Sequence, residues 1–270
     1  MLLVALQHIP GPISIVPGQQ FHEYDAEQCA TLIRTGFARP AEAVMVAQEP
    51  PAPQLKFSRT TFPNWVGARV VIIAGGPSLT EEQCAQVAAW QLRGPQNVVI
   101  AINTSFRRAP AATMLYACDT KWWDTYYDEV IRTVAAKTLL FTQDKPAAQK
   151  YGLGHIASAP ARGLSRKPGL IHQGMSSGFQ AINLAFLAGA RDFVLLGYDC
   201  KGTHWHGDHP PGLKSTLPHA RWIEHFATLA RDLRDEGVRI VNCSPDTAIP
   251  ESMFKPADLE TALFWSGGVA

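Results

Sequence analysis

From about residue 68 onward, short continuous apolar runs alternate with segments of helical periodicity. The runs are rich in valine, isoleucine and leucine, which is typical of parallel strands that helices cover on both faces. The pattern predicts strands at 69–74, 97–102, 112–117, 138–142, 192–197 and 238–242. It predicts helices at 80–92, 120–134, 145–151, 176–188 and 218–236, with a short one near 256–264. We therefore expect an α/β fold, with a Rossmann-like, doubly wound, mostly parallel sheet.

The first 65 residues have a different composition, rich in proline, with one helical segment at 26–34. We interpret residues 1–65 as a Pro-rich N-terminal arm or small lobe. It could pack on the body or make contacts between subunits of a homo-oligomer, and the sequence does not choose between these. Residues 66–270 form the predicted Rossmann-like nucleotide-binding and transferase domain.

Composition excludes several function classes. With 46% hydrophobic and 17% charged residues and a net charge of +1, the chain is globular and has no global basic field for nucleic acid or an anionic membrane. The five cysteines lack CxxC spacing, which favours free thiols in a reducing cytoplasm. No apolar stretch approaches the roughly 18–20 residues that span a bilayer, so we expect a cytoplasmic protein.

The predicted strand at 69–74 runs into a tight turn made of Gly75, Gly76, Pro77 and Ser78. Glycines let backbone amides approach a ligand, and the N-terminus of the following helix directs unpaired N–H groups at it. The turn is therefore a candidate anion site. It matches neither G-x-G-x-x-G nor a P-loop, so a conventional NAD or ATP site is not expected.

Polar residues also follow other predicted strands or open a helix. Ligands of open α/β sheets bind beyond the carboxyl ends of the strands, so these residues should share one site with the glycine turn. Asn103 and Thr104 suit a base or ribose, although either could instead cap a helix. The remaining candidates are Ser176, Ser177 and Gly178 at a helix start, and Gly197, Tyr198 and Asp199 after a strand.

The order GGPSL, a strand ending in Asn, SSG opening a helix, and a strand ending in G-Y-D resembles the bacterial CMP-sialic-acid-dependent sialyltransferase superfamily, including its flagellin-modifying and phage-encoded relatives. The match covers roughly residues 69–250. It implies a glycosyltransferase with a CMP-type nucleotide-sugar donor as cofactor, and an acceptor that is a glycan, a protein or a modified nucleic acid. The asparagine that the family places between the two glycines is absent here, so another nucleotide sugar is an alternative.

A histidine-rich loop, Lys201 to Gly212, follows Asp199 and contains His204, His206, Asp208 and His209. The string H-x-H-x-D-H could ligate divalent metal, as in binuclear hydrolases. The resemblance instead implies a catalytic histidine in this window, acting as general base on an acceptor hydroxyl. The candidates are His204, His209, His206 and His219, with Asp199 nearby.

Three functions therefore compete. The first is a nucleotide-sugar transferase with a loop histidine as base, which requires no metal. The second is a metal-dependent hydrolase or pyrophosphate-transfer enzyme that uses residues 204–209. The third is a non-enzymatic nucleotide-binding or virion-associated phage protein.

Overall fold

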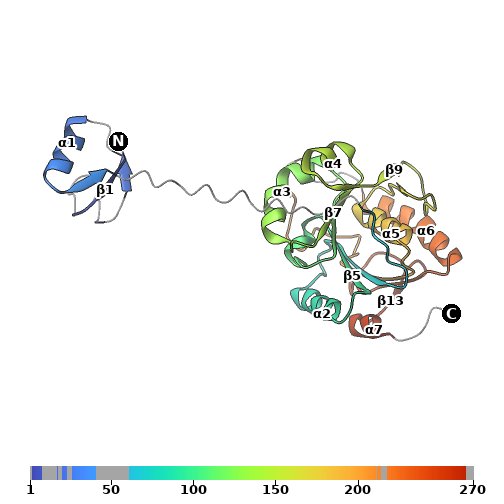
Figure 1. Ribbon diagram of the computed structural model, residues 1–270. Helices are drawn as coiled ribbons and strands as arrows, with labels where there is room; N and C mark the ends of the chain where they lie inside the picture. The colour runs from blue at the N-terminus through green and yellow to red at the C-terminus, as the bar shows by residue number, and fades with distance from the viewer. Residues whose placement is uncertain are drawn as a thin grey trace. The chain divides into compact units, whose positions relative to one another are not determined.

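The computed structural model describes residues 2–7, 17, 20–22, 26–40, 61–210, 212–213 and 218–265. The chain divides into two compact units, Met1–Lys56 and Phe57–Ala270 (Figure 1). Each unit has its own hydrophobic core. No helix in these described ranges has the length and apolar character needed to cross a membrane.

The first unit holds a three-stranded antiparallel sheet and one helix. The strands β1 (Leu2–Ala5), β2 (Gln20–His22) and β3 (Ala38–Pro40) lie in the order β2-β1-β3, and α1 spans Ala26–Arg34. Leu3, Cys29 and Ala38 form its small core. The helix was predicted, whereas the strands were not, because three or four residues are too few to establish an alternating pattern.

The second unit is built on an eight-stranded parallel sheet in the order β13-β12-β11-β4-β5-β6-β7-β8. Its strands are β4 (Arg69–Ile73), β5 (Asn97–Ile102), β6 (Met114–Tyr116), β7 (Leu139–Thr142), β8 (Gly154–His155), β11 (Asp192–Leu196), β12 (Arg239–Asn242) and β13 (Lys255–Pro256). The chain first progresses outward from β4 to β8 and later returns to add β11 on the other side of β4. The two neighbours β4 and β11 therefore mark the topological switch point, where open α/β sheets bind ligands.

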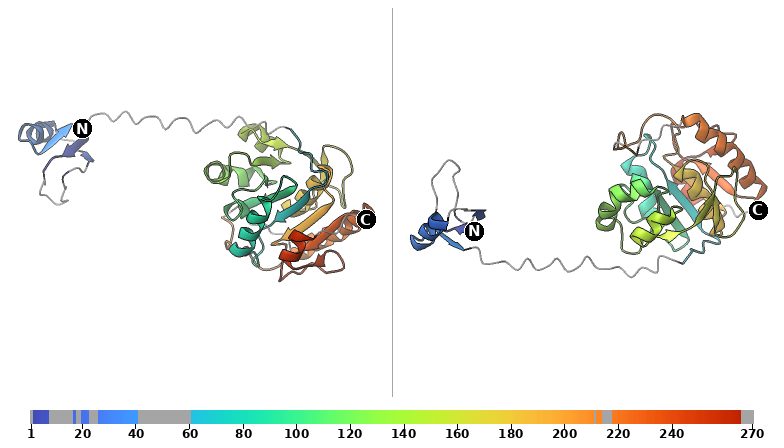
Figure 2. Two further views of the ribbon diagram at one scale, coloured as in Figure 1. Left: turned by 60° about the horizontal axis from the view of Figure 1, so that its bottom comes forward. Right: turned by 90° about the horizontal axis from the view of Figure 1, so that it is seen from above.

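Helices cover both faces of this sheet (Figure 2). They are α2 (Glu81–Gln91), α3 (Thr120–Thr133), α4 (Lys145–Tyr151), α5 (Ser177–Leu187), α6 (His219–Asp235) and α7 (Leu259–Phe264). Alternate residues of β4 serve the two faces: Val70 and Ile72 pack with α5 and α6, and Val71 and Ile73 pack with the other four helices. This arrangement confirms the predicted doubly wound α/β fold.

The six predicted strands all form, within two residues of the predicted ends. The elements that sequence missed are short: β8 and β13, the parallel pair β9 (Ala157–Ala159) and β10 (Leu170–His172), and the 3-10 helix η1 (Asn103–Arg107). Strands of two or three residues have no sequence period of their own, so only pairing with a neighbour identifies them.

Candidate functional site

A cavity of about 770 Å³ opens at the carboxyl ends of β4, β5, β6, β7 and β11. It therefore lies at the topological switch point of the sheet. The predicted residues that line it are Gly75, Gly76, Asn103, Ser176, Ser177, Gly178, Gly197, Tyr198, His204, His209 and His219. The predicted residues that do not line it are Pro77, Ser78, Thr104, Asp199, His206 and Asp208.

Two glycine turns cross at the floor of the cavity. The backbone N–H of Gly76 donates to the carbonyl of Gly197 at 2.9 Å. A Cβ on Gly76 would lie 2.5 Å from that carbonyl oxygen and 2.6 Å from Cγ of Asp199, so no side chain fits there. Gly197 has φ +69°, a conformation that glycine adopts at little cost. The neighbouring turn therefore requires a glycine at position 76.

Ser78 joins these turns through Asp199. Its backbone N–H and its hydroxyl donate to the two carboxylate oxygens of Asp199, each at 2.6 Å. Burial raises the pKa of Asp199, although the two hydrogen bonds from Ser78 favour the charged form. Asp199 is 1% exposed and does not line the cavity. Both of its oxygens accept hydrogen bonds from Ser78.

The two predicted anion sites differ in the charge of the first helical turn. At the start of α2, Thr80 and Gln83 cap each other reciprocally, and the acidic Glu81 and Glu82 occupy the first turn. An acidic first turn opposes binding of an anion at the same helix end. Together with the Ser78–Asp199 bond, this capping engages the N–H groups of Ser78, Thr80 and Gln83.

The start of α5 is different. The Ser176 hydroxyl accepts from the N–H of Phe179 at 3.2 Å, and no acidic residue lies in the first turn. The N–H groups of Ser177 and Gly178, at the first two helical positions, have no partner within the helix. Both residues line the cavity, so α5 presents backbone donors to it.

Three residues of the cavity wall have strained backbones. Asn103 (φ +49°), Met175 (φ +62°) and Cys200 (φ +49°) are the non-glycine residues with positive φ in the described ranges, and all three line the cavity. Such conformations cost about 1–3 kcal/mol each and cluster at functional sites. Asn103 Oδ1 also accepts a long hydrogen bond, 3.4 Å, from the Ser177 hydroxyl. Sequence identified Asn103 but gave no signal for the other two.

Side-chain amides line another part of the wall. Gln180 accepts from the Tyr116 hydroxyl at 2.7 Å and donates to the carbonyl of Gln173 at 2.9 Å. Gln143 donates to the carbonyl of Cys118 at 3.0 Å. Sequence reasoning missed these glutamines, although Gln143 directly follows β7 and could have been found by the strand-end rule.

Two of the predicted contact residues are buried. Tyr198 is buried, and its hydroxyl donates to the carbonyl of Gly178 at 3.0 Å, while its ring packs on Phe226 with centroids 6.0 Å apart. Thr104 is buried in η1, and its hydroxyl has no hydrogen-bond partner among the described residues.

The histidines of the loop come together as a histidine cluster, defined as His204, His206 and His209. One potential ligand nitrogen from each lies within 4.8 Å of the other two. Burial is the largest cause that lowers the pKa of His204 to about 4 and that of His206 to about 4, and it also lowers the pKa of His209. The three imidazoles are therefore neutral at pH 7 and keep lone pairs available. His219, the first residue of α6, lines the same cavity.

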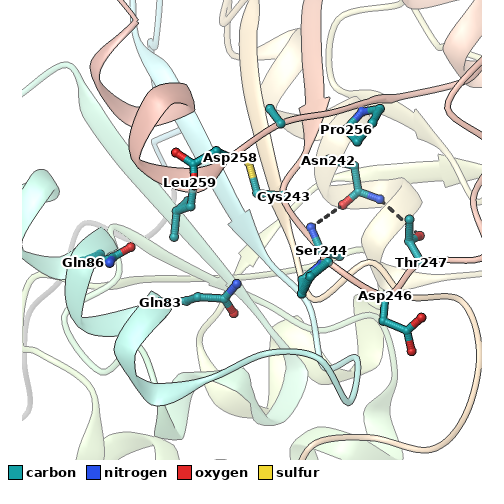
Figure 3. Close-up of a pocket in the computed structure, with 12 residues that line it drawn as sticks. Gln83, Gln86, Asn242, Cys243, Ser244, Asp246, Thr247, Pro256, Asp258 and Leu259 are labelled. Carbon is teal, nitrogen blue, oxygen red and sulfur yellow. Dashed lines mark hydrogen bonds between the residues drawn. The ribbon is translucent and has the colours of Figure 1, made fainter.

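A second hollow, of about 590 Å³, lies at the carboxyl end of β12 and between α2 and α7 (Figure 3). Its polar groups bond to each other: Asn242 accepts from the N–H of Ser244 at 3.0 Å and donates to the Thr247 hydroxyl at 3.2 Å. It contains none of the predicted site residues. The cavity at the switch point is therefore the candidate site.

Comparison with known proteins finds similarity at the level of the fold. No family model matches the chain, and no curated protein matches it. The solved structure of the MAf glycosyltransferase from Magnetospirillum magneticum AMB-1 is similar, with a TM-score of 0.52 and 14% sequence identity. The match covers 75% of this chain and 35% of that one, so the chain spans about a third of its length. At this identity the likeness shows a shared α/β fold.

Proposed function

We propose that the chain is a glycosyltransferase that binds a nucleotide-sugar donor in the switch-point cavity and transfers the sugar to an acceptor hydroxyl. The observation that carries the proposal is the convergence of Asn103, the start of α5 and three histidines on one cavity at the carboxyl edge of the sheet. The similar fold of a protein that is itself a glycosyltransferase supports it. The sequence resemblance to sialyltransferases favours a CMP-type donor.

In this proposal the start of α5 binds the donor phosphate. The free N–H groups of Ser177 and Gly178 and the positive end of the helix dipole stabilise negative charge. Lys121 also lines the cavity and adds a cation. As the bond between the anomeric carbon and the phosphate oxygen breaks, these groups stabilise the charge that develops on the leaving nucleotide.

The acceptor side of the reaction needs a base. The acceptor oxygen forms a bond to the anomeric carbon, and its proton passes to a neutral imidazole. His204, His209 and His219 line the cavity and are the candidates within reach of a bound donor. Asp199, whose two oxygens are engaged by Ser78, acts in this proposal by positioning the two glycine turns.

The amide wall suits recognition of a base. Gln143, Gln173 and Gln180 line it, and beyond the bonds they make within the protein each amide has a second N–H and a second oxygen lone pair, which suit the polar edge of a pyrimidine. Neutral amides discriminate a hydrogen-bonding pattern without attracting ions. We therefore expect the nucleobase at this wall and the phosphate at α5.

The test is binding followed by turnover. Calorimetric titration with CMP, UDP, GDP and ATP, in buffer containing EDTA, should give binding of a pyrimidine nucleotide. Lys121→Ala removes the cation that lines the cavity and should weaken that binding, whereas Ser252→Ala, at an exposed serine outside the cavity, should not. Absence of binding by every nucleotide contradicts the proposal. Binding without hydrolysis or transfer of any nucleotide sugar favours the non-enzymatic alternative.

A further inference from the structure

The histidine cluster has a chemical capacity that the proposed transfer does not require. Its three ligand nitrogens lie within 4.8 Å of one another, which small rotations of the rings bring to the spacing of ligands around one ion. We propose that His204, His206 and His209 form a binding site for one divalent transition-metal ion of the Zn²⁺ type. Its remaining coordination position would face the cavity.

The backbone around the cluster is well anchored. The N–H of Gly207 donates to the carbonyl of His204 at 2.9 Å and closes a tight turn, for which Gly207 adopts φ +83°. The N–H of Trp205 donates to the carbonyl of Gly75 at 3.1 Å, and the Arg108 guanidinium stacks 4.0 Å from the Trp205 ring centroid. A loop held at these points presents its imidazoles in a fixed arrangement, as a metal site needs.

The donor set selects the class of metal. Imidazole nitrogens suit Zn²⁺, Co²⁺, Ni²⁺ and Cu²⁺, whereas Mg²⁺ and Ca²⁺ prefer oxygen ligands. Nδ1 of His209 is buried and has no hydrogen-bond partner among the described residues, so a lone pair or N–H there is unsatisfied. Binding of a metal ion at this nitrogen would give it a partner.

The site differs from the binuclear one that the H-x-H-x-D-H string suggests. Asp208 is exposed and is not among the residues whose ligand atoms converge. Within the described part of the chain, the histidine cluster is the group of His, Cys, Asp or Glu residues that could hold an ion. A set of three imidazoles holds one metal and leaves a position for water or a substrate oxygen.

The position of the cluster indicates what that open position would contact. His204 and His209 line the cavity, and His206 does not. A metal held by all three would therefore sit at the cavity wall, within the space proposed for the donor and the acceptor. An imidazole that ligates a metal has committed its lone pair, so the role of base would then belong to His219.

Metal content of the protein without a polyhistidine tag tests the proposal. After exposure to equimolar Zn²⁺ and Mg²⁺ and removal of free ions, elemental analysis should find about one Zn²⁺ per chain and no Mg²⁺. Co²⁺ should give visible d–d absorption of the intensity expected for a low-coordinate site. Absence of stoichiometric Zn²⁺, or equal retention of Mg²⁺, overturns the proposal.

Variants assign the ligands. His206→Gln and His209→Gln should each weaken Zn²⁺ binding on the order of 100-fold or more, because loss even of a residue that only orients a ligand costs 10–100-fold. His219→Gln and His155→Gln, outside the cluster, should retain the metal. Unchanged affinity in both cluster variants overturns the proposal, and circular dichroism with thermal unfolding verifies that each variant is folded.

The result is independent of the proposed transfer, because metal is measured without nucleotide and nucleotide binding is measured in EDTA. Gly75→Ala provides a second measurement, in a variant that keeps all three histidines. Its Cβ would lie 3.0 Å from Cδ2 of His204 and would displace that ring, so Zn²⁺ affinity should fall. Gly94→Ala, where a Cβ meets nothing within 4 Å, is the matched control.

Discussion

Ser78 donates two hydrogen bonds of 2.6 Å to Asp199, one from its backbone and one from its hydroxyl, across 121 positions of sequence. The pair fixes the turn after β4 against the turn after β11, at the point where the progression of the strand order reverses. Its geometry makes Asp199 a structural clamp.

Asp199→Ala should therefore destabilise the protein by about 2 kcal/mol or more, because both donors of Ser78 lose an acceptor that is buried. Ser78→Ala should cost less, about 1–2 kcal/mol, since the backbone bond survives. Urea unfolding measures both changes, and the double variant should show strong coupling between them. Unchanged stability of Asp199→Ala with complete loss of turnover would instead assign Asp199 a catalytic role.

Gly76→Ala should be severely destabilising or prevent folding, because the new methyl group would lie 2.5 Å from the carbonyl oxygen of Gly197. Gly94→Ala adds the same methyl group where nothing lies within 4 Å. The thermal midpoint of this control should stay close to that of the parent protein. Similar midpoints for the two variants would contradict the crossing of the turns.

Two substitutions of Asn103 test the effects of backbone strain and of ligand contact separately. At φ +49°, Asn103→Gly should retain or raise stability, whereas Asn103→Ala should lower it by about 1 kcal/mol. Both variants remove the side-chain amide, so both should weaken nucleotide binding to a similar degree. Chemical unfolding and calorimetry measure the two effects, and full nucleotide affinity in Asn103→Gly would remove the amide from the site.

The two cysteines of the cavity should react slowly. Burial raises the pKa of Cys118 to about 12 and the pKa of Cys200 to about 12, from an ordinary value of 9.0. At pH 7 the thiolate fraction falls on the order of 1000-fold, and with it the rate of reaction with Ellman's reagent. All five thiols should react once denaturant is added. Rapid labelling of Cys118 or Cys200 in the native protein would contradict these raised pKa values.

The sequence contained most of the fold because its six main strands are continuous apolar runs with helices between them. It also pointed to the edge of the sheet at which the cavity opens, since the residues after β4, β5 and β11 can be found once the strands are known. Short elements such as β8 and β13 could not be found this way, because their identity depends on a neighbouring strand.

The site was less accessible to prediction. That the amides near Ser78 are already engaged depends on Asp199, a residue 121 positions away. The strained backbones of Met175 and Cys200 have no sequence signature, because neither residue type favours positive φ. The histidine string was visible, but only the structure shows that the ligand atoms of His204, His206 and His209 converge without that of Asp208.

Gly75 has two neighbours in the histidine loop. Its carbonyl accepts from Trp205, and its missing side chain leaves room for the ring of His204. A ligand that presses on this turn from the cavity would therefore move the imidazoles with it. Occupancy of the proposed donor site and the spacing of the three rings would then be linked, and by reciprocity an ion held by the rings would alter the affinity for the donor.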